Sequence, residues 1–316
     1  MRAKYRQAGG DYRLINREQN TKNIMIMLQD RDFPIPFTKM SGTGNDFIVI
    51  DHRQPFIAED MQSEFARQVC RRKFSAGADG LILIENSATA DFRWQFYNGD
   101  GSRAEMCGNG ARCAARFAFA KRIAPAAMRF ETTAGEIEAR ILNESGDTVK
   151  IRLTGPEDLR LQIPLTVGGS EQVLHFINTG VPHTVLLVGD ASEVPVADWG
   201  RAIRFHDLFQ PAGTNANFVQ VHNHDTLKVR TYERGVEDET MACGTGAVAA
   251  ALITALLDRA VPPVSVITSG GEQLTIHFSV TGGPGNRQLD LAAGIFLEGP
   301  AHVIYEGQLN RDALYE

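Results

Sequence analysis

The chain has 316 residues, and this length favours two domains because single hydrophobic cores stop growing near ~250–300 residues. It is 43% hydrophobic and 22% charged with a net charge of −6, the composition of an ordinary globular protein. This charge disfavours nonspecific nucleic-acid binding, and no apolar run reaches the ~18 residues of a transmembrane helix. We therefore expect a cytoplasmic protein that binds neither nucleic acid nor a membrane.

The first 33 residues are polar and lack the apolar core of a secretory signal. We expect residues 1–33 to be a disordered extension, or sequence that precedes a later start such as Met25 or Met27. Nothing in this segment points to a function.

From residue 46 onward the chain is dominated by short segments with the apolar pattern of β-strands. These segments are DFIVID (46–51), GLILIE (80–85), FRWQFY (92–97), VKIRLTG (149–155), HTVLLVG (183–189), NFVQVH (217–222), LKVRTYE (227–233) and AHVIYE (301–306). Between them, ARCAARFAFAKR (111–122) and AVAAALITALLDR (247–259) are predicted helices that are apolar around most of their circumference. Helices of this kind are buried in a core rather than laid on a surface.

The two predicted helices belong to an internal repeat. Cys107-Gly-Asn-Gly-Ala matches Cys243-Gly-Thr-Gly-Ala, and MRFETTAGEIEARI (128–141) matches VSVITSGGEQLTIHF (264–278). The repeat predicts an α/β (α+β) protein of two pseudosymmetric domains, each a mostly antiparallel curved sheet wrapped around a central apolar helix. Because breakers cluster near Thr154, we place one domain at residues 34–154 plus 300–316 and the other at 155–299.

The repeat places Cys107 and Cys243 immediately before the two apolar helices. At a helix N-terminus, unpaired backbone N–H groups and the positive end of the macrodipole favour a thiolate, and the same groups can hold a carboxylate. The chain's four cysteines are too few and too scattered for a disulfide framework. Since no Cys-x2-Cys or His-x3-His pair occurs, no metal site is predicted.

A cysteine beside glycines at a helix start is also a common small core residue, but packing alone gives little reason to keep the same sulfur at the same turn of both halves. If two such units face one substrate, one thiolate can remove an α-proton while the other thiol delivers a proton to the opposite face. This chemistry is that of a racemase or epimerase that needs no pyridoxal phosphate or other cofactor.

The sequence resembles the diaminopimelate epimerase family in four segments. They are FTKMSGTGNDFIVID (37–51), NGDGSRAEMCGNGARC (98–113), TNANFVQV (214–221) and YERGVEDETMACGTGA (232–247). The resemblance implies an isomerase that interconverts LL- and meso-2,6-diaminopimelate for lysine and peptidoglycan precursor synthesis. It also implies a homodimer without cofactor, with Cys107 and Cys243 as the catalytic pair.

The resemblance further implies a set of substrate-binding residues. The backbone of Gly108, Asn109, Gly244 and Thr245 would hold the reacting carboxylate, while Asn45, Asn98, His183, Asn215, Glu233 and Arg234 would complete the site. Two positions depart from some members of the family, namely Gly80 where they have Gln and Val181 where they have Asn. Cys70 and Cys113 match no catalytic position, and we interpret them as structural.

Two alternatives stay open at this level. One is another racemase of the same fold, of the proline or hydroxyproline type, although a single-carboxylate substrate would not need Glu233 and Arg234. The other is a dithiol redox-switch binding protein in which Cys107 and Cys243 form a disulfide. Activity that resists both oxidant and thiol alkylation would count against the epimerase and the switch alike.

Overall fold

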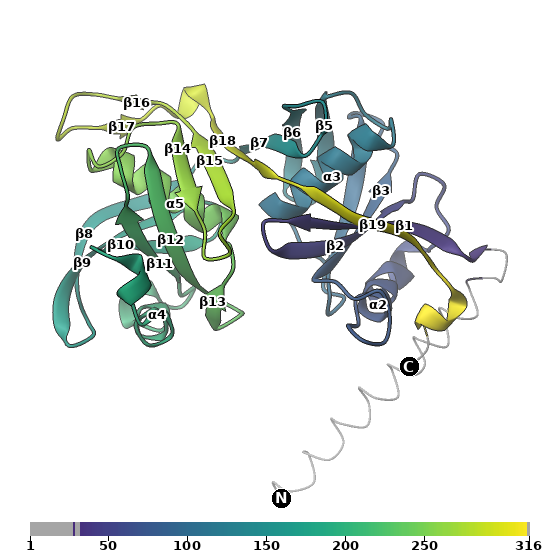
Figure 1. Cartoon of the computed structure of the whole chain (residues 1–316), viewed down its shortest axis with the longest axis horizontal. Coiled ribbons are helices and arrows are strands. Elements are labelled where there is room, and N and C mark those ends of the chain that lie inside the picture. The colour runs from purple at the N-terminus through teal and green to yellow at the C-terminus, as the bar shows by residue number, and fades with distance from the viewer. Residues whose placement is uncertain (1–27, 29–31, 315–316) are drawn as a thin grey trace, which may run out of the picture. The chain divides into compact units, whose positions relative to one another are not determined.

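The computed structural model describes residue 28 and residues 32–314, and it divides into two compact units (Figure 1). One unit comprises Asn45–Glu136 with the described residues up to Ser41 and from His302 on, and the other comprises Gly42–Gly44 and Ile137–Ala301. Residues 1–27 and 29–31 lie outside the described part, so the extension expected at 1–33 falls almost wholly beyond it. The first unit ends before the breaker cluster near Thr154 because β7 (Thr148–Leu153) pairs with β18 (Ile295–Pro300) of the second unit.

The first unit is one mixed sheet with a helix on each face. Its elements are β1 (Ile35–Gly42), β2 (Asn45–Asp51), α2 (Glu59–Val69), β3 (Gly80–Glu85), β4 (Phe92–Asn98), α3 (Gly108–Ala120), β5 (Ala127–Thr132) and β19 (His302–Leu309), while β6 (Gly135–Ile141) crosses to the second unit. β1 pairs antiparallel with β19, β2 parallel with β3, β3 antiparallel with β4, and β4 parallel with β5.

The second unit repeats this plan. Besides β7 and β18, its elements are β8 (Glu157–Val167), β9 (Ser170–Asn178), β10 (Pro182–Leu187), α4 (Val196–Arg204), β11 (Asn215–Val221), β12 (Thr226–Glu233), β13 (Asp238–Thr240), α5 (Gly244–Leu256), β14 (Val264–Ile267) and β15 (Gln273–His277), with the small pair β16 (Val280–Thr281) and β17 (Gln288–Leu289). β10 runs parallel to β11, β11 antiparallel to β12, and β12 parallel to β14, as β2 to β5 do in the first unit. The predicted pseudosymmetric fold is confirmed, and the eight predicted strand segments each coincide with an observed strand.

The central helices are buried, as expected from sequences that are apolar around most of their circumference. All residues of α5 from Gly246 to Leu256 are buried, and α3 packs on β2 and β3 so closely that a Cβ on Gly110 would lie 3.4 Å from Ile82 Cδ1. Glycine and alanine at these positions allow the helix to approach the sheet.

A second helix covers the other face of each sheet, which the sequence analysis did not anticipate. Phe65 and Val69 of α2 share a hydrophobic cluster with Leu81 of β3, and Ile203 of α4 shares one with Phe218 of β11. β3 is therefore buried on both faces, which explains its unbroken apolar sequence.

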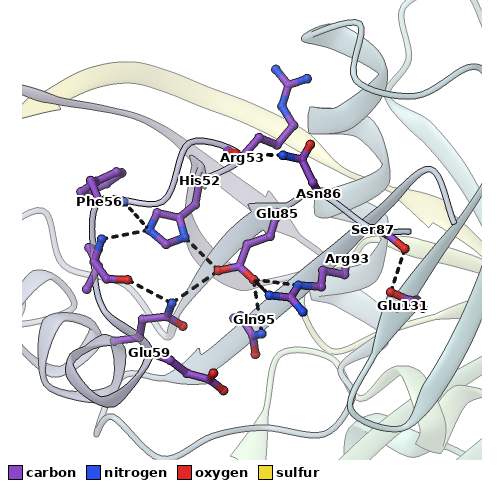
Figure 2. Close-up of polar contacts among 12 residues, drawn as sticks. His52, Arg53, Phe56, Glu59, Glu85, Asn86, Ser87, Arg93, Gln95 and Glu131 are labelled. Carbon is purple, nitrogen blue, oxygen red and sulfur yellow. Dashed lines mark hydrogen bonds and ion pairs between the residues drawn. The ribbon is translucent and has the colours of Figure 1, made fainter. Parts of the chain in front are cut away.

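A buried polar cluster closes the end of the first sheet that carries the C-termini of β2 and β3 (Figure 2). Glu85 accepts hydrogen bonds from His52 Nδ1 at 2.9 Å and Arg93 Nε at 2.9 Å, and His52 Nε2 accepts the backbone N–H groups of Phe56 and Ile57. Burial by itself raises the pKa of the Glu85 carboxyl, but the hydrogen bonds from His52 and Gln95 and the charge of Arg93 outweigh it, so the pKa lies below its ordinary 4.5. The ionised carboxylate thus ties the loop after β2 to the sheet.

We expect Glu85→Gln to lower the free energy of unfolding by about 1–3 kcal/mol near neutral pH, because it weakens the hydrogen bonds of a buried charged group. A carboxyl whose pKa is lower in the folded than in the unfolded protein stabilises above the unfolded pKa, and this contribution is lost as the pH falls through the folded value. Urea unfolding of both proteins at about pH 7 and about pH 3 measures this. The difference should shrink at the acid pH, and a difference that stays constant contradicts the assignment.

Candidate active site

Cys107 occupies the N-cap position of α3. Its backbone is extended, with φ −146° and ψ 118°, and its sulfur accepts a hydrogen bond from the backbone N–H of Gly110 at 3.5 Å. Its carbonyl accepts the N–H of Ala111 at 2.8 Å, which begins the helix. The half-buried sulfur therefore lies among the N–H groups that a helix start leaves without intrahelical partners, at the positive end of the helix dipole.

Asn109 connects this turn to the start of β2. Its side-chain amide donates to Asn45 Oδ1 at 2.7 Å, and its own Oδ1 accepts from the guanidinium of Arg112 at 2.8 Å. Arg112 is fully buried and also donates to the carbonyl of Gly108 at 3.2 Å. Arg112 was missed by the sequence analysis, where it is one more residue of an apolar helix, yet it fixes the side chain next to the cysteine.

Asn45 in turn belongs to a charged cluster at the same end of the sheet. Asn45 Nδ2 donates to Asp79 Oδ2 at 3.2 Å, and Arg72 donates to Asp46 at 2.6 Å and to Asp79 at 2.9 Å. Burial raises the pKa of the Asp46 carboxyl, but hydrogen bonds from Arg72 and Lys39 outweigh it and the pKa is lowered. This cluster and the hydrogen bond to Asn109 hold Asn45 in place relative to α3.

Asn98 ends β4, is exposed, and donates to Ser102 Oγ at 3.0 Å. It lies opposite Gly80 in the ladder of β3 and β4. A Cβ on Gly80 would lie 2.8 Å from Phe96 Cε2 and 2.8 Å from the carbonyl oxygen of Tyr97. A side chain at position 80 would therefore force Phe96 or the backbone of β4 to move, so the present packing favours glycine.

Cys243 is the N-cap of α5, with φ −125° and ψ 107°. Its sulfur lies 3.6 Å from the hydroxyl oxygen of Thr245, and that hydroxyl lies 2.9 Å from His183 Nε2. Thr179 Oγ1 donates to the carbonyl of Thr245 at 3.0 Å. The second unit thus repeats the N-cap cysteine but surrounds it with different side chains.

His183 is fully buried on β10. Burial, reinforced by the positive charge of Arg234, lowers the pKa of His183 to about 3, so its imidazole is neutral. The side-chain Nδ2 of Asn217, on β11, lies 3.1 Å from His183 Nδ1. The sequence analysis did not single out Asn217, because its proximity to His183 arises only from the pairing of β10 with β11.

Three of the expected substrate-binding residues, Asn215, Glu233 and Arg234, lie where β11 begins and β12 ends. Asn215 Oδ1 accepts the backbone N–H of Arg234 at 2.7 Å, and the Arg234 guanidinium donates to the carbonyl of Ala212 at 2.7 Å. Burial raises the pKa of Glu233, although the hydroxyl of Thr240, which donates to Oε2 at 2.9 Å, opposes this shift. Glu233 thus offers a half-buried carboxylate with capacity for a cation.

Cys113, Cys70 and Val181 lie in packed surroundings that indicate structural roles. Cys113 is buried in α3, and burial raises the pKa of the buried Cys70 thiol to about 12. Val181 is partly buried, and its carbonyl accepts the N–H of Thr179. Within residues 28 and 32–314, no group of three or more His, Cys, Asp or Glu side chains is placed to hold a metal ion. Over the same residues, no helix has the length and apolar character to cross a membrane.

The model of the diaminopimelate epimerase family matches residues 37–158 and 175–286. The diaminopimelate epimerase of Aquifex aeolicus is 49% identical over 287 residues, which cover 88% of this chain and 99% of the relative. Among solved structures, a PhzF-family phenazine biosynthesis protein of Bacillus anthracis superimposes with a TM-score of 0.65 at 15% identity, over 87% of this chain and 98% of that one. A probable proline racemase of Agrobacterium radiobacter gives 0.62 at 13% identity, over 87% and 92%. These two solved structures share the fold of this chain.

The two repeats provide a matched test of how tightly the helix starts are packed. A Cβ on Gly246 would lie 2.4 Å from Asn217 Oδ1, whereas a Cβ on the equivalent Gly110 meets no atom closer than 3.4 Å. We expect Gly246→Ala to destabilise the protein by about 1–3 kcal/mol through overpacking. Gly110→Ala should be neutral or stabilising by up to about 1 kcal/mol, since alanine favours helix. Thermal and urea unfolding measure the stability of each variant. Equal losses of stability in Gly246→Ala and Gly110→Ala would contradict the observed packing.

Proposed function

Because the chain belongs to the diaminopimelate epimerase family, we propose that it uses Cys107 and Cys243 as the acid and base of the family's reaction. The activity is that of an isomerase of diaminopimelate, in lysine biosynthesis. The single observation that supports the proposed roles is that each repeat presents a half-buried cysteine at the N-cap of its central helix.

In the proposed reaction, the LL and meso forms interconvert at one α-carbon. A thiolate removes the α-proton and becomes a thiol, and the electron pair of the broken C–H bond remains on the α-carbon and its carboxylate. The other cysteine, as a thiol, then gives its proton to the opposite face and becomes a thiolate. The two sulfurs exchange protonation states in each turnover, and the reverse reaction starts from the exchanged state. The proton transfers use only these two sulfur atoms.

The same helix starts would bind the reacting carboxylate. Gly108 and Asn109 begin α3 and Gly244 and Thr245 begin α5, so their backbone N–H groups are oriented along the helix axes. We assign the α-carboxylate to these N–H groups, because helix N-termini favour anions. The same groups stabilise the negative charge that develops on this carboxylate when the proton leaves.

The distal amino-acid end of the substrate, which does not react, requires its own contacts. We assign its carboxylate to Asn98, Asn215 and Arg234 and its ammonium to Glu233, since a guanidinium suits a carboxylate and a carboxylate suits an ammonium. Asn45 lines the site beside Asn109. Burial of Glu233 supports this role, because a cationic substrate group would compensate for the cost of desolvating its carboxylate. A proline-type substrate has no second carboxylate or ammonium group for Arg234 and Glu233 to bind.

We further propose that the protein works in the cytoplasm as a homodimer. The family resemblance suggests both. The exposed apolar side chains of Val303, Ile304 and Tyr305 on β19 would favour burial against a second copy.

Cys107→Ala and Cys243→Ala should each lower the rate of epimerisation by at least about 10³-fold, since a positioned acid or base supplies ~10²–10⁴ and both are needed in each turnover. Conversion of LL- to meso-diaminopimelate in D₂O, followed by mass spectrometry, measures both inversion and deuterium uptake at the α-carbon. Cys70→Ala, which removes a buried thiol outside the site, should retain activity. Full epimerisation by either single variant would refute the paired-sulfur scheme.

Glu233→Gln should raise KM for diaminopimelate by about 10- to 100-fold with a smaller change in kcat, because a contact with the distal end is equally strong in ground and transition states. Steady-state kinetics in both directions measures the two constants. Glu171→Gln, at an exposed position of β9, serves as the matched charge control and should change neither. A fall in kcat at constant KM would place Glu233 at the reacting carbon and contradict its distal assignment.

A further inference from the structure

The second unit contains a chain of polar contacts that ends on the sulfur of Cys243. Asn217 Nδ2 lies 3.1 Å from His183 Nδ1, His183 Nε2 lies 2.9 Å from Thr245 Oγ1, and Thr245 Oγ1 lies 3.6 Å from Cys243 Sγ. Asn217 and His183 are 1% and 0% exposed, so solvent does not compete for these contacts. This series of polar contacts thus connects the interior of the sheet with the sulfur of Cys243.

The orientation of the Asn217 amide is fixed by its other neighbours. Its Nδ2 also donates to the carbonyl of Thr184 at 2.8 Å, and its Oδ1 accepts the hydroxyl of Thr231 at 2.9 Å. A flipped amide would turn its oxygen toward the Thr184 carbonyl, where two acceptors would repel each other. The NH₂ group therefore faces His183, and His183 Nδ1 acts as the acceptor.

This orientation sets the direction of every hydrogen bond that follows. A neutral imidazole carries a hydrogen on only one of its two ring nitrogens. Since Nδ1 accepts, this hydrogen is on Nε2. Nε2 then donates to the hydroxyl oxygen of Thr245. A hydroxyl has a single hydrogen, and since it is not needed toward His183, it can be donated to Cys243 Sγ, 3.6 Å away. Burial and the charge of Arg234 keep His183 neutral, so it acts here as a fixed donor.

We propose that Asn217 is a positioning residue that, through the tautomer of His183, directs the hydroxyl hydrogen of Thr245 onto Cys243 and favours its thiolate. The proposal rests on the proposed function, in which Cys243 alternates between thiol and thiolate. It also makes the two cysteines chemically different. The position equivalent to Thr245 is Asn109, whose side chain bonds to Asn45 instead, and Cys107 accepts a backbone N–H from Gly110.

The test is the pH dependence of iodoacetamide alkylation at Cys107 and at Cys243 in the full chain without substrate. Mass spectrometry of the proteolytic peptides that contain these two cysteines quantifies the alkylation. In Asn217→Leu, the tautomer with hydrogen on Nδ1 becomes available, His183 Nε2 then accepts the Thr245 hydroxyl, and the sulfur loses a donor. We expect the midpoint of Cys243 alkylation to rise by about one pH unit, the size of a hydrogen bond to a charged group. Arg234, whose charge acts on His183, and Glu233 are the same in the wild-type and variant proteins. Cys107 should keep its midpoint and serves as an internal reference.

Two further variants separate this role from a loss of packing. Thr254→Val replaces a buried hydroxyl of the same helix that bonds only to the carbonyls of Ala250 and Ala251, and it should shift neither midpoint. Thr231→Val loosens the Asn217 amide and should raise the Cys243 midpoint by a smaller amount. If Asn217→Leu does not fold, the Thr231→Val result decides.

An unchanged Cys243 midpoint in the folded variants, or an equal shift at both cysteines, overturns the proposal. Epimerase kcat should fall by about tenfold in Asn217→Leu with KM nearly unchanged, as for an effect on the reacting sulfur alone. The alkylation readout needs no turnover. Failure of the proposed function would instead appear as full epimerisation by a Cys107→Ala or Cys243→Ala protein.

Discussion

The placement of a cysteine at the first turn of a buried helix is the constraint on which the rest of this protein depends. In the proposed reaction, the sulfur and the substrate carboxylate at this position would both draw on backbone N–H groups that the helix leaves without partners. Cys107 and Cys243 have the same extended N-cap backbone, and the residues that follow them are glycines and small side chains. The proposed two-sulfur reaction would need this electropositive position twice, which would give a physical reason for the duplicated fold.

The layers of each unit keep these helix starts in fixed positions. α3 and α5 are each buried against one face of a sheet, and α2 and α4 close the other face. The close approach of the layers leaves little freedom, since a Cβ on Gly200 of α4 would lie 2.3 Å from Tyr232 Cβ. Polar clusters also close both ends of the first sheet, with Glu85 and His52 at one end and Asn45 and Asp79 at the other. A rigid scaffold of this kind suits a reaction in which small displacements of acid and base are costly.

The two halves are similar in fold and different in the side chains around the sulfur. In the first unit, buried Arg112 orients Asn109, which holds Asn45, and the cysteine depends on backbone N–H groups. In the second, Asn217 and His183 act through the hydroxyl of Thr245. In the proposed complex, one end of diaminopimelate reacts while the other is only held, so similar but unequal halves suit it better than identical ones.

The sequence by itself determined eight strand segments, the strands of the repeat, the two buried helices and the cysteines at their starts, because these follow from local apolar periodicity and from a repeat that can be read directly. It did not single out β8 and β9. It did not reveal that α2 and α4 cover the second face of each sheet. It also could not show that the packing at position 80 favours glycine, since Phe96 and Tyr97 approach it from another strand. Arg112 and Asn217 act through neighbours brought close by helix packing and strand pairing. Only the tertiary structure decided these roles, because hydrogen bonds and steric contacts depend on distances between segments that no local pattern encodes.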